Sequence, residues 1–430
     1  MRNAVASFVL GCVTVAAGAE LPSHTAPGIT NFPKLSAEMD WPWWRGPTRN
    51  GIAPPRSAPP TTWNETENIV WKAPVPGRGH SSPIVIGNRI FLSTADKEKQ
   101  VQSVLALDRA SGKQLWKVDI NQGGFPSTHP HNTHATPTVA GDGELLFVTF
   151  HHHDQLQAVA LDHDGKIAWS KSLGEFHPKQ YEYGYGPSPV LYRETVIIAA
   201  EYDGDSFITA LNRKTGQQVW RTPRPDNITF STPSIVVIGK QELLAISGGD
   251  QVACFDPATG RPLWAVEGTT AATCGTIVWD GDILFASGGY PKAETVAIRV
   301  AARGGEVLWK NQQQCYEESM LAYRGYLYAF TGKGVLYCFR ASDGKPMWQK
   351  RLRGAVSASP VLAGGHIYWA NERGTMYVFK PDPQACELVA ENVLGDESFA
   401  SPAVSGNQIF LRVAVHAGDA RQEYLYCIGK

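Results

Sequence analysis

One phrase recurs along this chain of 430 residues and constrains its fold more than any other feature. It reads ALDRASGKQLW at residues 106–116. Full copies occupy 210–220, 254–264 and 338–348, a shortened copy occupies 160–169, and a worn copy ends at Trp309. Each copy predicts a strand end, a tight turn built on Asp or Asn and Gly, and a second strand that begins near Trp. A unit this small cannot bury its apolar face alone, so the copies must pack against one another.

A second phrase precedes each copy and marks the start of a repeat. It is a small residue followed by Pro and an apolar pair. We find it at Ser82-Pro83, Thr136-Pro137, Ser188-Pro189, Thr232-Pro233, Ser359-Pro360 and Ser401-Pro402, and without Pro at Gly275-Thr276 and Ser319-Met320. Pro suits the first residue of a strand. Four short strands about every 40–50 residues are the period of a propeller blade. The sequence therefore predicts an all-β, eight-bladed β-propeller of four-stranded blades.

The two ends of the repeat region complete each other. Residues 69–73 form a strand with no earlier strand of a blade before it, and the last repeat ends at Lys430 without its outer strand. We therefore expect residues 69–430 to form the propeller, closed by this N-terminal strand, because closure removes an exposed blade edge. Residues 20–68 are expected to form an extended arm. Its segment WPWWRGPTRNG, residues 41–51, either packs on the outside of the ring or forms an aromatic binding platform.

The first nineteen residues have the pattern of a signal peptide cut after Ala19. A lipid anchor on Cys12 is the alternative. No later segment is apolar for long enough to span a membrane as a helix, so we expect a periplasmic or secreted protein. Lys and Arg number 39 against 40 Asp and Glu. This balance argues against a nucleic-acid partner, which requires a basic excess.

The cysteines and tryptophans have structural interpretations. Cys254, Cys338 and Cys427 occupy one repeat position that Ala fills elsewhere, so they are expected in the core. Cys274 and Cys315 stand at the entrances to blades five and six and are candidates for a disulfide, which an exported protein permits. The tryptophans expected to dock between blades are Trp71, Trp116, Trp169, Trp220, Trp264, Trp309 and Trp348.

Candidate ligand-binding residues lie in the loops that join blades and in the hairpins between second and third strands, which share one face of a propeller. We call this the loop face; loops on a rigid scaffold often carry binding residues. His80 and His134 each stand three residues before a Pro, and Glu317 takes the same position in blade six. His129, His131 and His152 lie in neighbouring loops. These groups either hold a polar ligand or form a solvated rim. Imidazoles suit Zn or Cu, but the spacing matches no metal motif, so no metal is assigned. No phosphate loop, nucleophile elbow or zincin motif is present, and no catalytic residue is assigned.

The phrase A-x-D-x-x-[ST]-G-x-x-x-W resembles the tryptophan-docking repeat of quinoprotein alcohol dehydrogenases and their non-catalytic relatives. Residues 106–116 and 254–264 match it best, and the likeness covers about residues 70–430. The resemblance implies eight blades and, for the enzymes, pyrroloquinoline quinone and Ca²⁺ on the axis beneath an adjacent cysteine pair. This chain has no adjacent cysteine pair. The arm also resembles the opening of a bacterial group of quinone-binding-like propeller repeat proteins, and BamB-type outer-membrane assembly factors are further relatives.

We therefore expect an exported monomeric propeller that binds a protein or a small polar ligand on its loop face, without quinone catalysis. A small quinone- and calcium-dependent oxidoreductase and a BamB-type assembly factor are the alternatives, because a fold alone does not decide function.

Overall fold

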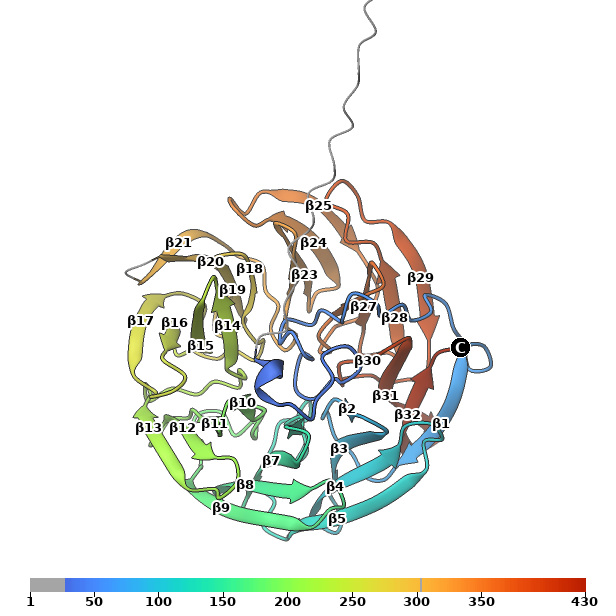
Figure 1. Ribbon diagram of the computed structural model, residues 1–430. Coiled ribbons are helices and arrows are strands. Elements are labelled where there is room, and N and C mark those ends of the chain that lie inside the picture. Colours follow the sequence, from blue (N-terminus) through green and yellow to red (C-terminus); the bar gives the residue numbers. More distant parts are fainter. Residues whose placement is uncertain (1–27, 302–303) are drawn as a thin grey trace, which may run out of the picture.

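The computed structural model describes residues 28–301 and 304–430, so the predicted signal peptide and Cys12 lie outside the described residues. The described chain forms eight four-stranded antiparallel sheets arranged as blades around a central axis (Figure 1). One short 3-10 helix, η1 (Ile29–Asn31), precedes them. The predicted eight-bladed propeller is confirmed. Among the described residues, no helix is both long and apolar enough to cross a membrane.

The blades follow one another in chain order. Blade one is β2 (Ile84–Ile86), β3 (Arg89–Asp96), β4 (Val101–Asp108) and β5 (Gln114–Gln122). Blade two is β6 (Ala140–Gly141), β7 (Leu145–His152), β8 (Gln155–Asp162) and β9 (Ile167–Glu175). Blade three is β10 (Val190–Tyr192), β11 (Thr195–Ala200), β12 (Phe207–Asn212) and β13 (Gln218–Pro223). Blade four is β14 (Ser234–Ile238), β15 (Gln241–Gly248), β16 (Gln251–Phe255) and β17 (Pro262–Glu267).

The second half of the ring repeats this order. Blade five is β18 (Val278–Asp280), β19 (Ile283–Gly288), β20 (Glu294–Ala301) and β21 (Gly304–Asn311). Blade six is β22 (Leu321–Tyr323), β23 (Tyr326–Thr331), β24 (Val335–Arg340) and β25 (Pro346–Arg351). Blade seven is β26 (Val361–Ala363), β27 (His366–Ala370), β28 (Thr375–Phe379) and β29 (Leu388–Val393). Blade eight is β30 (Ala403–Ser405), β31 (Gln408–Ala417), β32 (Ala420–Ile428) and β1 (Ile69–Val75).

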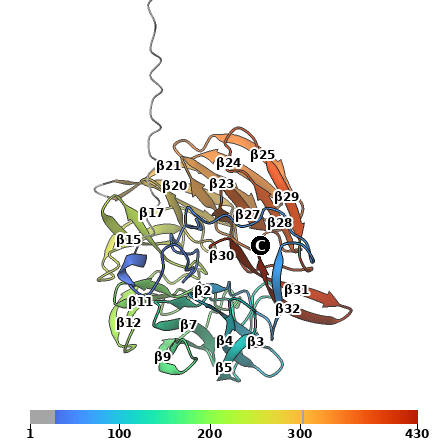
Figure 2. The same cartoon turned by 45° about the vertical axis from the view of Figure 1, so that its right-hand side comes forward.

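The ring is closed by the N-terminal strand, as predicted. β1 pairs antiparallel with β32, with Trp71 opposite Cys427 and Val75 opposite Glu423. The two strands lie together at the edge of the ring (Figure 1), and the β31–β32 hairpin extends beyond its neighbours in the turned view (Figure 2). Closure gives blade eight the same four strands as the others and leaves no blade without an outer strand.

The repeated tryptophans join each blade to the next. The indole of Trp71 lies against Gly112 in the last turn of blade one and donates a 2.9 Å hydrogen bond to the carbonyl of Arg109. Equivalent bonds run from Trp116 to His163, Trp169 to Arg213, Trp309 to Ala341 and Trp348 to Asp382. Trp220 and Trp264 lie against Gly260 and Gly305. Trp169 and Trp220 are buried and the other five are partly buried.

The residue across the sheet from each tryptophan is small. Cys254 pairs with Trp264, Cys338 with Trp348 and Cys427 with Trp71, while Ala occupies this position in other blades. All three cysteines are buried free thiols. A small side chain there leaves space beside the indole, which accounts for the restriction of this position to Ala and Cys.

The tryptophan-rich arm is a plug in the centre of the ring. Trp41, Trp43, Arg45 and Arg49 are each at most 5% exposed, and the arm occupies the middle of Figure 1. The expectation that this segment packs on the outside of the ring is therefore wrong. The segment lies inside the ring because its polar side chains hydrogen-bond to backbone groups at the innermost strands of the blades.

Three polar side chains of the plug hydrogen-bond to the backbone of three different blades. Arg45 donates a 2.7 Å hydrogen bond to the carbonyl of Pro360, and Arg49 donates a 2.6 Å bond to that of Leu191. Asn50 exchanges two hydrogen bonds with the backbone of Trp279. Buried guanidinium groups are tolerated only when paired in this way.

Candidate ligand site on the propeller axis

A ring of hydroxyl groups surrounds the axis above the plug. In seven of the eight blades, the backbone N–H two residues before the innermost strand donates to a Ser or Thr hydroxyl of the next blade. The acceptors are Thr138, Ser188, Thr232, Ser319, Ser359, Ser401 and Ser82. The eighth hydroxyl, that of Thr276, instead accepts a 2.8 Å hydrogen bond from the indole of Trp44. The small residue of the repeat therefore links blade to blade, and Trp44 of the plug completes the ring.

A second ring lies two residues before the hydroxyls, and we call it the rim. Its members are His80, Thr136, Gly186, Phe230, Cys274, Glu317, Ser357 and Phe399. All eight line one cavity of about 280 Å³ on the axis. Each blade thus contributes one rim residue at the same height, and the nature of that residue differs from blade to blade.

Aromatic side chains make up much of the cavity lining. Tyr183, Tyr290 and Tyr316 line it from the loops, Phe230 and Phe399 line it from the rim, and Trp44 lies at the plug. Tyr183 stacks on Phe230 with ring centroids 6.1 Å apart. Since the plug fills the axis beneath Trp44, the cavity opens on the loop face. Concave, largely apolar cavities with a few convergent polar groups are the usual form of ligand sites.

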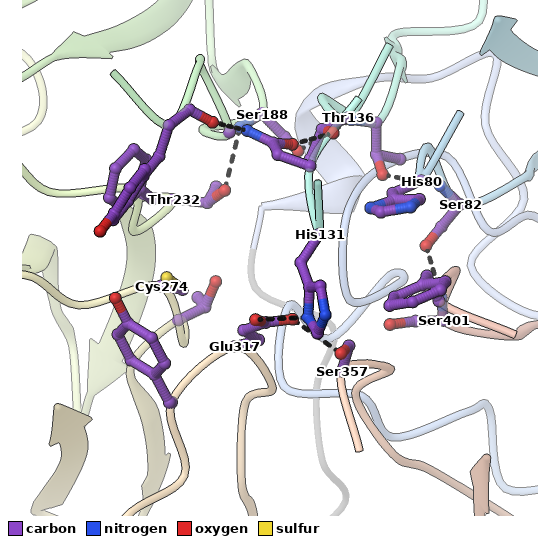
Figure 3. A pocket seen from close by; sticks show the side chains of 18 of the residues that line it. His80, Ser82, His131, Thr136, Ser188, Thr232, Cys274, Glu317, Ser357 and Ser401 are labelled. Atoms are coloured by element: carbon purple, nitrogen blue, oxygen red, sulfur yellow. Dashed lines mark hydrogen bonds and ion pairs between the residues drawn. The ribbon is translucent and has the colours of Figure 1, made fainter. Parts of the chain in front are cut away.

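Four of the predicted ligand residues line this cavity, namely His80, His129, His131 and Glu317. His131 Nδ1 lies 3.7 Å from Glu317 Oε1 (Figure 3). His80 stacks on Phe399 with centroids 4.5 Å apart, and its buried Nε2 has no hydrogen-bond partner among the described residues. His129 packs edge-on against Tyr183.

His134 and His152 are not among the residues that line the cavity. The prediction that His134 occupies the same position as His80 is wrong. In blade two Ala140 pairs with Phe147, as Ile84 pairs with Phe91 in blade one, so the residue equivalent to His80 is Thr136. Pro137 stands two residues too early to mark the strand. His134 instead packs edge-on against Phe125, and His152 ends strand β7 beside His153.

Sequence reasoning missed two residues, Ser357, which lines the cavity, and Glu372, which lies beside it. Ser357 Oγ lies 2.7 Å from Glu317 Oε2 and 2.6 Å from Glu372 Oε1. Glu372 lies in the turn between β27 and β28, and together with His131 and Glu317 it places three potential metal-ligating atoms within 4.8 Å of one another. Ser357 could have been found from the rim position, two residues before Ser359, whereas no sequence signal singles out Glu372.

The electrostatics of the cavity favour neutral forms of its buried groups. Burial lowers the pKa of His80 well below its usual range, and the nearby Arg78 and Arg412 lower it further. Burial raises the pKa of Glu317; Ser357 and His131 oppose this shift and Glu372 adds to it. Burial disfavours a charged form unless an opposite charge compensates.

Cys274 and Cys315 are both free thiols, so the expected disulfide is not formed. Cys315 is buried, and its thiol donates to the carbonyl of Phe330 at 3.7 Å, whereas Cys274 lines the axial cavity. The two side chains therefore lie in different environments and do not pair with each other. Burial raises the pKa of both thiols well above the usual range, which makes them weak nucleophiles.

The cavity does not fit the quinone cofactor that the resemblance raises. Pyrroloquinoline quinone is a planar polycarboxylate, yet no Arg or Lys stands among the described residues that line the cavity, and Glu317 adds negative charge. Trp44 offers an aromatic floor, but no adjacent cysteine pair exists to cover the opposite face of the quinone. The group of potential metal ligands beside the cavity consists of one imidazole and two carboxylates, His131, Glu317 and Glu372, whereas calcium prefers six or more oxygen ligands.

The fold and its docking pattern define this protein as an eight-bladed propeller of the tryptophan-docked class. A family model described as outer membrane protein assembly factor BamB matches residues 100–323 and 292–383. These ranges cover more than half of the chain, and the chain belongs to this family.

Individual relatives include both assembly factors and enzymes. Outer membrane protein assembly factor BamB of Burkholderia pseudomallei is 24% identical over 365 residues, covering 73% of this chain and 87% of that protein. Tetrathionate hydrolase of Acidithiobacillus ferrooxidans is 24% identical over 359 residues, covering 71% of this chain and 66% of the hydrolase.

Solved structures of similar shape fall into the same two groups. BamB from Moraxella catarrhalis superimposes with a TM-score of 0.60 at 13% identity, covering 83% of this chain and 96% of that one. Quinohemoprotein alcohol dehydrogenase from Comamonas testosteroni superimposes with a TM-score of 0.64 at 12% identity, covering 95% of this chain and 83% of the dehydrogenase. At these identities the likeness concerns the fold alone.

Proposed function

We propose that this protein is an exported, non-enzymatic binding and scaffold propeller that engages its partner through the loop face, with the axial cavity as the anchoring point. The observation that carries the proposal is an axial cavity bounded by Trp44 of the plug and lined by aromatic side chains of the loops and the rim. Aromatic side chains around a concave site are the usual anchors of peptide and protein recognition. Its membership of a family described as an assembly factor supports a scaffold role.

The proposed location is the periplasm or the cell exterior, and the proposed state is a monomer. The alternative of a quinoprotein oxidoreductase is disfavoured by the absence of cationic side chains on the cavity wall of the described chain. The alternative of a true BamB-type outer-membrane assembly factor differs from the main proposal only in the identity of the partner.

Site-specific photocrosslinking in the cells that make the protein tests the proposal. Benzoylphenylalanine replaces Tyr183 or Tyr290 at the cavity mouth, and in a matched control it replaces the exposed Lys240, which lies in a first-to-second strand turn on the opposite face. We expect a discrete protein adduct from the two mouth positions and none from Lys240. Identical adducts from both faces, or none from the mouth, would contradict the proposal. The mass of the adduct identifies an outer-membrane barrel component if the partner is of BamB type.

A further inference from the structure

Three side chains from different parts of the chain converge at the mouth of the axial cavity. His131 comes from the long loop between blades one and two, Glu317 from the rim of blade six, and Glu372 from a hairpin turn of blade seven. Their ligand atoms lie within 4.8 Å of one another. An ion bound at about 2.0–2.2 Å by each of two tetrahedral ligands holds them roughly 3.4 Å apart. The 3.7 Å between His131 Nδ1 and Glu317 Oε1 is close to that spacing.

The two carboxylates are held close together, and no Lys or Arg of the described chain forms an ion pair with either of them. Ser357 Oγ lies within hydrogen-bonding distance of both, at 2.7 Å from Glu317 and 2.6 Å from Glu372. A hydroxyl has only one proton to donate, so Ser357 satisfies one carboxylate and leaves the other to be stabilised by a cation or a proton. A dication beside Ser357 would balance both negative charges.

The ligands are carried by well-anchored backbone. The N–H of Glu372 donates to the carbonyl of Ala355 at 2.9 Å, and the carbonyl of Glu372 accepts from Ser398 at 3.1 Å. Asn132, next to His131, donates to the carbonyl of Tyr183 at 2.6 Å. Preorganised ligands of this kind lower the cost of binding an ion.

An independent observation also points to a bound group in this cavity. The ring nitrogen Nε2 of His80 is buried, lines the same cavity and has no hydrogen-bond partner among the described residues. A buried polar atom without a partner is costly, and a water or ligand atom on a metal ion would provide one.

We infer that His131, Glu317 and Glu372 bind one divalent transition-metal ion, Zn²⁺ by the chemistry of the ligand set, with the remaining coordination open to the axial cavity. One imidazole and two carboxylates suit zinc, and three protein ligands with an open position are typical of sites that take a further ligand. An anionic or chelating group of a ligand would complete the coordination. The inference stands whether the loop face receives a protein or a small molecule.

Isothermal titration of the full mature chain, stripped of metal with a chelator and then dialysed, tests the inference. We expect one Zn²⁺ per chain to bind saturably, and Ca²⁺ to bind at least about 100-fold more weakly, because calcium requires six or more oxygen ligands. Glu372→Gln and His131→Ala should each weaken Zn²⁺ binding by on the order of 100-fold, and Ser357→Ala by about 10-fold, since partners that orient ligands matter nearly as much as ligands.

Matched controls separate this site from other histidines and acids of the loop face. Glu182→Gln and His153→Ala change exposed residues of the same types on the same face, and both should leave Zn²⁺ affinity unchanged. Circular dichroism of each variant establishes that it is folded. No saturable Zn²⁺ binding by the full chain would overturn the inference. Binding that survives Glu372→Gln but is lost in His153→Ala would also overturn it, by assigning the ion to the His151–His153 tip.

Discussion

The contact between Trp71 and Gly112 makes ring closure measurable. Gly112 has φ +69°, and a Cβ at this position would lie 2.5 Å and 2.7 Å from two atoms of the Trp71 ring. The indole cannot easily retreat, because its N–H is bonded to the carbonyl of Arg109. Gly112→Ala therefore combines a left-handed backbone cost of about 1–2 kcal/mol with an overpacking cost of about 1–3 kcal/mol.

A control glycine isolates the second cost. Gly365 has φ +76° but nothing within 4 Å of an added Cβ, so Gly365→Ala should show only the backbone cost of about 1–2 kcal/mol. The loss of unfolded-chain entropy that accompanies any Gly→Ala change is the same in both variants and cancels in their difference. The difference in free energy of unfolding should thus be about 1–3 kcal/mol.

Guanidinium denaturation, followed by circular dichroism and tryptophan fluorescence, measures this difference. A Gly112→Ala protein as stable as Gly365→Ala would refute the reasoning, because it would mean that Trp71 does not dock on blade one.

Three further outcomes are expected. Burial lowers the pKa of His151 to about 4, so between pH 6.5 and 4 the unfolded chain binds a proton that the folded chain does not, and stability falls as pH falls. The free energy of unfolding should therefore fall between pH 7 and pH 5 by about 2 kcal/mol less in His151→Phe than in the parent protein. An equal fall in both proteins would contradict the lowered pKa of His151. Deleting residues 20–75 should cause aggregation, since blade eight loses its outer strand, whereas deleting residues 20–27 should not; a soluble monomer with unchanged melting temperature from the longer deletion would count against closure by β1. Dye-linked alcohol oxidation after addition of pyrroloquinoline quinone and Ca²⁺ should remain at the blank level, and turnover abolished by Glu317→Gln would restore the quinoprotein reading.

The blades could be predicted because their signals are local. A turn of the type Asp-x-x-Ser-Gly and a tryptophan four residues later fix a strand pair without reference to the rest of the chain. Closure of the ring by β1 could also be predicted from the sequence, because the last repeat lacks one strand and the chain has one extra strand before its first repeat.

The plug and the shifted register of blade two lay beyond this reasoning. The guanidinium groups of Arg45 and Arg49 donate to carbonyls 315 and 142 residues away along the chain, which no local pattern reveals. In blade two the hairpin turn is set by Asp142, whose carboxylate accepts from the backbone N–H groups of Glu144 and Leu145. Strand β6 therefore begins three residues after Pro137, whereas β2 begins directly after Pro83. For this reason the sequence pattern places His134 on the axis in place of Thr136.

For the same reason, only part of the candidate site could be predicted from the sequence. His80 and Glu317 could be assigned to the rim because each stands at a fixed distance from the start of its blade. Glu372 lies in an ordinary hairpin turn, and only the packing of blade seven beside blade six brings that turn to Glu317.

The rim has a consequence for how such a ring changes its specificity. The hydroxyl ring and the docked indoles link each blade to the next, whereas the eight rim side chains differ widely, from Gly186 to Phe230 and Glu317. Because the plug blocks the central channel of the ring, a ligand of the cavity enters and leaves past these eight rim positions. A substitution at the rim therefore changes the lining of the cavity while the hydroxyl ring and the docked tryptophans still join the blades, and only Ser357 and Glu317, which are hydrogen-bonded to each other, would change together.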